Sequence, residues 1–241
     1  MAANNNMRHQ SAKEVIMVRP ASFGFDEDTM ADNAFQKVVP EDGDAKKVHE
    51  KALEEFDGVV QLLKRNGVTV ITFNDNPMPA KPDAIFPNNW FSTNCDGSLF
   101  IYPMMAASRR TEQRMDIVKY LEDIYQVDKV INWKQLENEG VFLEGTGSVV
   151  FDHIFKKAYA CISSRTNAKL VGQMCKHLSY EPILFEAFDD KHGKPIYHTN
   201  VLMWIGTTVT AICADAIPDV AIRVSSKLII LHSLIFRVAR F

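Results

Sequence analysis

Hydrophobic and polar positions along the chain follow a layout that recurs. Three segments each open with an apolar strand, turn at a polar or glycine-rich patch and return as a second strand. A helical stretch and a further strand are expected after each hairpin, although we expect the last copy to break off early. The three copies begin near Ile85, Val141 and Val201, and the residues before them fit as a looser copy.

The predicted strands are 15–18, 68–73, 91–93, 99–102, 129–131, 141–143, 148–151, 158–162, 183–185, 201–205 and 209–213. An amphipathic helix is expected over 46–65, with Gly67 as its C-cap. Further helices are expected over about 110–125, capped by Ser108, near 167–178, and after Asp215. No Gly/Ser linker separates the copies, so we predict one α/β domain of ββαβ repeats.

Three polar residues follow their opening strands at matching places in the copies. Asn88, Glu144 and His198 are 56 and 54 residues apart. If the repeats close into a ring, as propeller blades do, such residues converge on a shared channel. Strand ends and turns are polar in most proteins, so the match can also arise by chance.

An acid and two amides stand at the mouth of a strand in the stretch from Pro82 to Trp90. Asp83 could accept hydrogen bonds from a cationic or ureido nitrogen, and Asn88 and Asn89 lie beside it. An Asx-turn that caps the strand entry is the structural alternative.

Glu144 lies between apolar residues and glycines, which favours an inward-facing carboxylate that needs a partner. A β-bulge with a solvent-exposed Glu144 is the alternative. His198 opens an apolar strand and is a candidate general acid/base, although a lone histidine there is more often structural. Three arginines, Arg109, Arg110 and Arg165, stand at helix starts and suit a substrate carboxylate, or are ordinary surface charge.

Composition narrows the function classes. The 241 residues are 46% hydrophobic and carry a net charge of -3, which argues against nucleic-acid binding. Four cysteines form no CxxC pair, and no histidines have zinc-ligand spacing. We therefore expect reduced thiols, no metal and no cofactor. No secretory signal is recognised, so a cytoplasmic protein with no membrane span is expected, and a homodimer is compatible with the sequence.

Taken together, these motifs resemble the arginine deiminase-related, citrulline-utilisation type of amidinotransferase-like (pentein) proteins, and more distantly dimethylarginine dimethylaminohydrolases. The resemblance covers roughly residues 14–217. It is carried by Val18-Arg19-Pro20, Phe35-Gln36, the stretch from Pro82 to Phe91, Ser108-Arg109-Arg110, Leu143-Glu144-Gly145, Arg165-Thr166-Asn167 and Tyr197-His198-Thr199-Asn200.

The resemblance implies a five-bladed α/β propeller and a cysteine thiolate that attacks an amidine or ureido carbon. His198 would protonate the leaving amine and then activate water, while Glu144 and Asp83 hold the substrate nitrogens. Arg165 and one of Arg109 or Arg110 would hold the substrate carboxylate. Asn200, in the histidine motif, is assigned to substrate binding with Asn88 and Asn89.

Two departures from the family pattern change the expectation. Relatives that act on the guanidinium cation carry acids where this chain has the neutral Asn88 and Asn89, which favours a ureido group such as that of citrulline. The family's nucleophile lies in the final repeat, and one more spacing of about 55 residues from His198 passes Phe241. Cys95, Cys161, Cys175 and Cys213 are poor substitutes.

The domain organisation expected from the sequence has three parts. A disordered, polar tail is expected over 1–13 and the propeller over 14–218. An aberrant C-terminal tail, in which an interfacial helix is an alternative, is expected over 219–241. We therefore expect a C-terminally truncated hydrolase-family chain that is inactive because it lacks the nucleophilic cysteine. The alternative is an amino-acid-binding pseudoenzyme or a fragment.

Overall fold

The computed structural model describes residues 9–30, 45–125, 127–189, 193–219 and 234–236. Residues 12–141 form one compact unit, and residues 9–11 with the described residues from 142 onward form the other. The Phe35-Gln36 patch and most of the stretch expected to be helical after Asp215 lie outside the described residues. No described helix is long and apolar enough to cross a membrane.

The first unit, 12–141, contains two sheets. Its strands are β1 (Glu14–Arg19), β2 (Thr69–Asn74), β3 (Phe91–Thr93), β4 (Ser98–Ile101) and β5 (Lys129–Asn132). Its helices are α1 (Glu27–Met30), α2 (Ala45–Arg65) and α3 (Met115–Tyr125), with 3₁₀ turns η1 (Pro87–Asn89), η2 (Ser108–Glu112) and η3 (Lys134–Glu139). β1 pairs with β2 in parallel, and the second sheet has the order β3-β4-β5.

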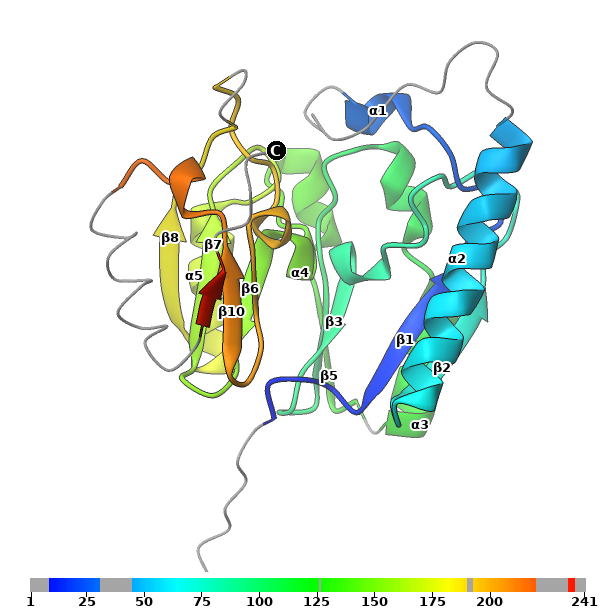
Figure 1. The fold of residues 1–241 in the computed structure, drawn as a ribbon, viewed down its shortest axis with the longest axis horizontal. Coiled ribbons are helices and arrows are strands. Elements are labelled where there is room, and N and C mark those ends of the chain that lie inside the picture. Colours follow the sequence, from blue (N-terminus) through cyan, green and yellow to red (C-terminus); the bar gives the residue numbers. More distant parts are fainter. Residues whose placement is uncertain (1–8, 31–44, 126, 190–192, 220–233, 237–241) are drawn as a thin grey trace, which may run out of the picture. The chain divides into compact units, whose positions relative to one another are not determined.

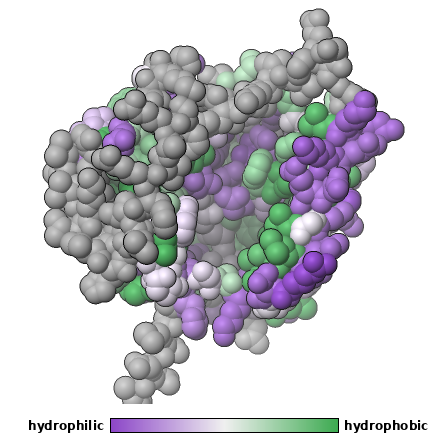
Figure 2. All heavy atoms as spheres, in the orientation of Figure 1, coloured by the Kyte–Doolittle hydropathy of each residue, from purple (hydrophilic) through white to green (hydrophobic). Residues whose placement is uncertain are grey.

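The helix α2 confirms the amphipathic pattern read from the sequence. Phe56 is its buried residue, and the charged outer face appears as an extended hydrophilic surface in Figure 2. Figure 1 shows α2 lying along β1 and β2, and Arg19 of β1 donates two hydrogen bonds of 2.8 Å to the Asp57 carboxylate of α2. Gly67, at φ +79°, ends the helix in the left-handed conformation expected of a C-cap.

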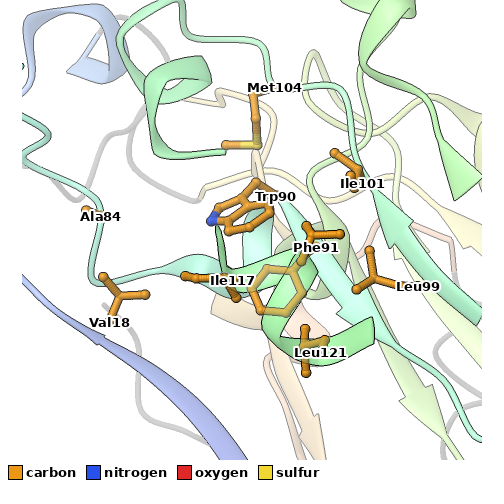
Figure 3. Close-up of a cluster of buried hydrophobic side chains, with 10 residues drawn as sticks. Val18, Ala84, Trp90, Phe91, Leu99, Ile101, Met104, Ile117 and Leu121 are labelled. Carbon is orange, nitrogen blue, oxygen red and sulfur yellow. The ribbon is translucent and has the colours of Figure 1, made fainter. Parts of the chain in front are cut away.

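The core of this unit is built around the buried strand β4, with α3 packed beside it. Figure 3 shows Trp90 and Phe91 among side chains from α3 and from β4. The aromatic rings of Trp90 and Phe91 lie 4.4 Å apart. Because β4 is buried along its whole length, its apolar run holds the β3–β4 hairpin and hence the turn η1, which carries two of the predicted site residues.

The second unit repeats the same sheet order twice. Its strands are β6 (Val149–Asp152), β7 (Lys157–Cys161), β8 (Glu181–Phe185), β9 (Met203–Ile205), β10 (Val209–Ile212) and β11 (Leu234–Phe236). Its helices and 3₁₀ turns are α4 (Gly145–Ser148), α5 (Ala168–Leu178), η4 (Thr199–Val201) and η5 (Ala214–Ala216). In each sheet an antiparallel hairpin is followed by a parallel strand, in the orders β6-β7-β8 and β9-β10-β11.

The structure corrects four expectations about individual elements. The helix expected from residue 110 begins at Met115, because Gln113 is extended and interrupts it. Ser108 is not its N-cap, since its hydroxyl donates to Asp26 Oδ2. No strand forms at 141–143, where Leu143 makes only an isolated bridge to Thr166. The third copy does not break off before its closing strand, because β11 pairs with β10.

Candidate functional site

Glu144 is fully buried at the start of the helical turn α4. The residues after it are Gly145, at φ +45°, Thr146 and Gly147, and the positive φ that glycine tolerates lets the chain turn sharply here. The Glu144 amide is held by the Arg165 carbonyl at 3.2 Å and by the Ser148 hydroxyl at 3.0 Å. The solvent-exposed alternative for Glu144 is therefore wrong.

The Glu144 carboxylate contacts two groups that can carry positive charge. His198 Nε2 lies 2.8 Å from Glu144 Oε2, and Arg165 Nη1 lies 3.4 Å from the same oxygen. Arg165 is 2% exposed and His198 5% exposed, so all three side chains are withdrawn from water. A buried carboxylate is stable only when it is paired in this way.

Two aromatic contacts complete this cluster. The Arg165 guanidinium lies over the Tyr197 ring at 5.0 Å, and the rings of Tyr197 and His198 are 4.8 Å apart. The Tyr197–Arg165 contact adds cation–π attraction to the ion pair. Asn200, the remaining predicted residue of this motif, is exposed in η4.

The other unit holds the predicted residues around Asp83. Arg109 is 3% exposed and donates from Nε and Nη2 to Glu112 at 3.0 and 2.9 Å, and from Nη1 to Asn89 Oδ1 at 2.9 Å. Asp83 Oδ2 lies 3.8 Å from Arg109 Nε. Asn88 is half-buried in the same turn η1. Arg109, Asn89 and Asp83 therefore come together, with Glu112 as a further member.

Glu112 was missed by sequence reasoning. The sequence feature that could have revealed it is its position three residues after Arg109. At that spacing opposite charges lie on one face of a helix and can pair. Arg110 points elsewhere, donating to the carbonyls of Met104 and Met105 at 3.0 and 3.1 Å. Arg109 and Arg110 both have hydrogen-bond partners within the protein. Their assignment to a substrate carboxylate stays a prediction.

The four cysteines differ in exposure. Cys95 is exposed, Cys213 is half-buried, and Cys161 and Cys175 are buried. Burial raises the pKa of the Cys161 and Cys175 thiols to about 11. Since the thiolate is the nucleophilic form, neither buried residue has the character of a catalytic cysteine. Among the described residues, no cluster of three or more histidines, cysteines or acids could hold a metal ion.

The comparison with protein families gives one match. A sequence profile described as N,N dimethylarginine dimethylhydrolase, eukaryotic, matches residues 19–234. The match extends past Asp219, where the resemblance noted from the sequence ends. No curated protein sequence matches the chain.

Several solved structures share the fold. The N-terminal domain of ArgZ, a cyanobacterial arginine dihydrolase bound to its substrate, is 17% identical with a TM-score of 0.68, over 92% of this chain and 75% of that one. AgrE in complex with L-arginine is 16% identical, with a TM-score of 0.68, and the match covers 94% of this chain and 31% of the AgrE chain. A dimethylarginine dimethylaminohydrolase, as an adduct with S-methyl-L-thiocitrulline, is 17% identical, with a TM-score of 0.57. The match covers 83% of this chain and 68% of that one.

The chain spans only 29% of the ArgZ chain in its apo structure. At these identities the likeness establishes the fold alone, a mixed α/β fold shared with these structures.

Proposed function

The chain belongs to the eukaryotic N,N dimethylarginine dimethylhydrolase family, and from this premise we propose that it binds an arginine-like amino acid for hydrolysis of a guanidino or ureido C–N bond. The observation that carries the proposal is the buried contact of 2.8 Å between Glu144 Oε2 and His198 Nε2. A carboxylate that fixes an imidazole in this way prepares the ring for general acid–base work. Where a cysteine thiolate attacks the carbon, a protonated His198 gives its proton to the departing amine, and the neutral ring then takes one from the water that hydrolyses the covalent intermediate.

The protonation of His198 follows from its partner. An ionised carboxylate only accepts hydrogen bonds, so the Nε2 atom that faces Glu144 carries the proton. In the neutral ring Nδ1 is then the basic atom. Arg165, 3.4 Å from the same carboxylate oxygen, favours the ionised form of Glu144.

The first test measures binding, because binding does not depend on a nucleophile. L-Citrulline and L-arginine are titrated calorimetrically into the protein and into Glu144→Gln and His198→Asn. We expect measurable binding to the unaltered chain and at least about tenfold weaker binding to both variants, from the loss of one charged hydrogen bond. The matched controls are Glu181→Gln and His177→Asn, both at exposed positions, which should bind as the unaltered chain does. Absence of binding by the unaltered chain would contradict the proposal.

We propose further that none of the four cysteines is the nucleophile and that this sequence by itself performs no thiol-dependent hydrolysis. The support is the burial of Cys161 and Cys175, with thiol pKa values of about 11, and the position of Cys95 in the exposed β3–β4 turn. Turnover of either amino acid that iodoacetamide abolishes would overturn this proposal.

The amides Asn88 and Asn89 support a preference for a neutral ureido group over a guanidinium cation. Asn89 Oδ1 already accepts from Arg109, so the buried acceptor in this turn is neutral and committed to a cation of the protein. We therefore propose that citrulline binds more tightly than arginine. Tighter binding of arginine in the same titration would contradict this preference.

The remaining features of the architecture are proposals as well. A closed ring of ββαβ repeats is supported by three sheets that share one strand order, although the third takes its closing strand β11 from beyond the expected boundary at 218. The pairing of β11 with β10 argues against a separate tail over the whole of 219–241. A cytoplasmic location and a homodimer remain expectations from the sequence.

A further inference from the structure

The residue after His198 is a threonine whose hydroxyl is completely buried. Thr199 Oγ1 accepts a hydrogen bond from the Cys161 amide at 2.7 Å and donates one to the Ser148 carbonyl at 2.6 Å. Both distances are at the short end for such bonds. One hydroxyl therefore ties the segment that carries His198 to the end of β7 and to the turn α4.

The turn α4 is the element that carries the partner of His198. The Ser148 hydroxyl accepts from the Glu144 amide at 3.0 Å and donates to the Arg165 carbonyl at 2.9 Å. Ser148, like Thr199, is 0% exposed. The chain of contacts runs from Thr199 through Ser148 to the backbone of Glu144 and Arg165, so two hydroxyls connect all three charged members of the cluster.

A third hydroxyl holds the other side of His198. Ser163 Oγ donates to the Tyr197 carbonyl at 2.7 Å and accepts from the Arg165 amide at 3.2 Å. The backbone on both sides of His198 is thus fixed by side-chain hydroxyls to the segments that position Arg165 and Glu144. Nothing in the general acid–base chemistry of an imidazole requires these hydroxyls, which points to a role in placement.

We propose that Thr199 is a positioning residue whose hydroxyl sets the distance and the tautomer of the His198–Glu144 pair. This inference rests on the proposed function of that pair. A side-chain hydroxyl that bonds two backbone segments leaves little freedom for the short turn η4, which begins at Thr199. Without it, the His198 segment is released from Ser148, and the contact of 2.8 Å between Nε2 and Oε2 is no longer imposed.

The alternative is that Thr199 only satisfies two buried backbone groups. The two roles are separated by a pair of substitutions: Thr199→Ser keeps the hydroxyl and loses the methyl group, whereas Thr199→Val keeps the shape and loses the hydroxyl. Thr210→Val, at a buried threonine on β10 in the same unit, is the control for a buried threonine-to-valine exchange.

The measurement is nitrogen-15 NMR of the His198 ring, whose two nitrogen shifts report which atom carries the proton. The signals are assigned by their absence in His198→Asn, since the chain has seven histidines. We expect Nε2–H as the main form in the unaltered chain, in Thr199→Ser and in Thr210→Val. We expect Thr199→Val to lose this preference and to show the two tautomers in exchange.

Unchanged nitrogen shifts in Thr199→Val would overturn the inference, as would an equal change in Thr199→Ser. If Thr199→Val does not fold, Thr199→Ala, which also lacks the hydroxyl and introduces no added bulk, takes its place with the same two outcomes. The result is independent of ligand binding. A chain that binds neither citrulline nor arginine but shows the expected NMR pattern would refute the proposed function and leave the positioning role standing.

Discussion

Replacing Glu144 by glutamine should destabilise the protein strongly, because it removes a buried charge and leaves its partners buried. Breaking a buried ion pair from one side costs about 3–5 kcal/mol. Glutamine retains an oxygen that can accept from His198, which recovers about 1 kcal/mol of that loss. The Arg165 guanidinium also keeps its contact with the Tyr197 ring at 5.0 Å. We therefore expect a loss of about 2–4 kcal/mol in the free energy of unfolding.

The assay is thermal and urea unfolding followed by circular dichroism, with Glu181→Gln as the matched control. Glu181 pairs with Lys157 at 3.4 Å, but its side chain is 67% exposed, and surface pairs contribute only about 0–1 kcal/mol. At about 2–4 °C per kcal/mol for a chain of this size, Glu144→Gln should lower Tm by about 4–16 °C. A Tm change no larger than that of the control would refute the view that Glu144 is a buried, paired carboxylate.

Four further predictions follow from individual residues. Iodoacetamide at pH 8 should alkylate Cys95 and spare Cys161 and Cys175, as judged by peptide mass spectrometry, because burial raises the pKa of both thiols to about 11; equal labelling of all three would contradict this. The raised pKa values of Cys161 and Cys175 should also make stability depend on pH. The free energy of unfolding should fall as pH rises from about 9 to about 11, because the thiols of the unfolded chain lose their protons first. A urea midpoint that is higher at pH 10 than at pH 8 would contradict this prediction. Asn167→Ala removes the α5 N-cap, whose side chain accepts two amide hydrogen bonds, and should cost about 1 kcal/mol in urea unfolding, whereas no change would show that water replaces the cap. Arg109→Lys loses the bidentate contact with the Glu112 carboxylate, and it should lower the free energy of unfolding by more than Asn167→Ala does. Unfolding at the same urea concentration as the unaltered chain would contradict this prediction.

The contact between Glu144 and His198 was anticipated from the sequence, but the protein partners of the predicted arginines were not. The matching positions of Glu144 and His198 in successive repeats predicted that they would meet, and the two side chains are in contact. Arg165 was assigned to a substrate carboxylate, whereas the structure places it against Glu144. The pairing of Arg109 with Glu112 was not foreseen, because local spacing gives the same signal for a solvent-exposed pair.

Among the elements of the fold, the sequence by itself determined those with a strong local signal. The helix α2 and the hairpin strands follow from the period of their apolar residues and from turn residues such as Gly67, which act over a few positions. The delayed start of α3 and the missing strand at 141–143 were decided by the tertiary structure. Asp26 takes the Ser108 hydroxyl from 82 residues away, and Thr166 is the bridge partner of Leu143. Such contacts join segments distant in sequence, so their energy appears only when the chain is folded, and it can then outweigh the weak propensity of any one segment.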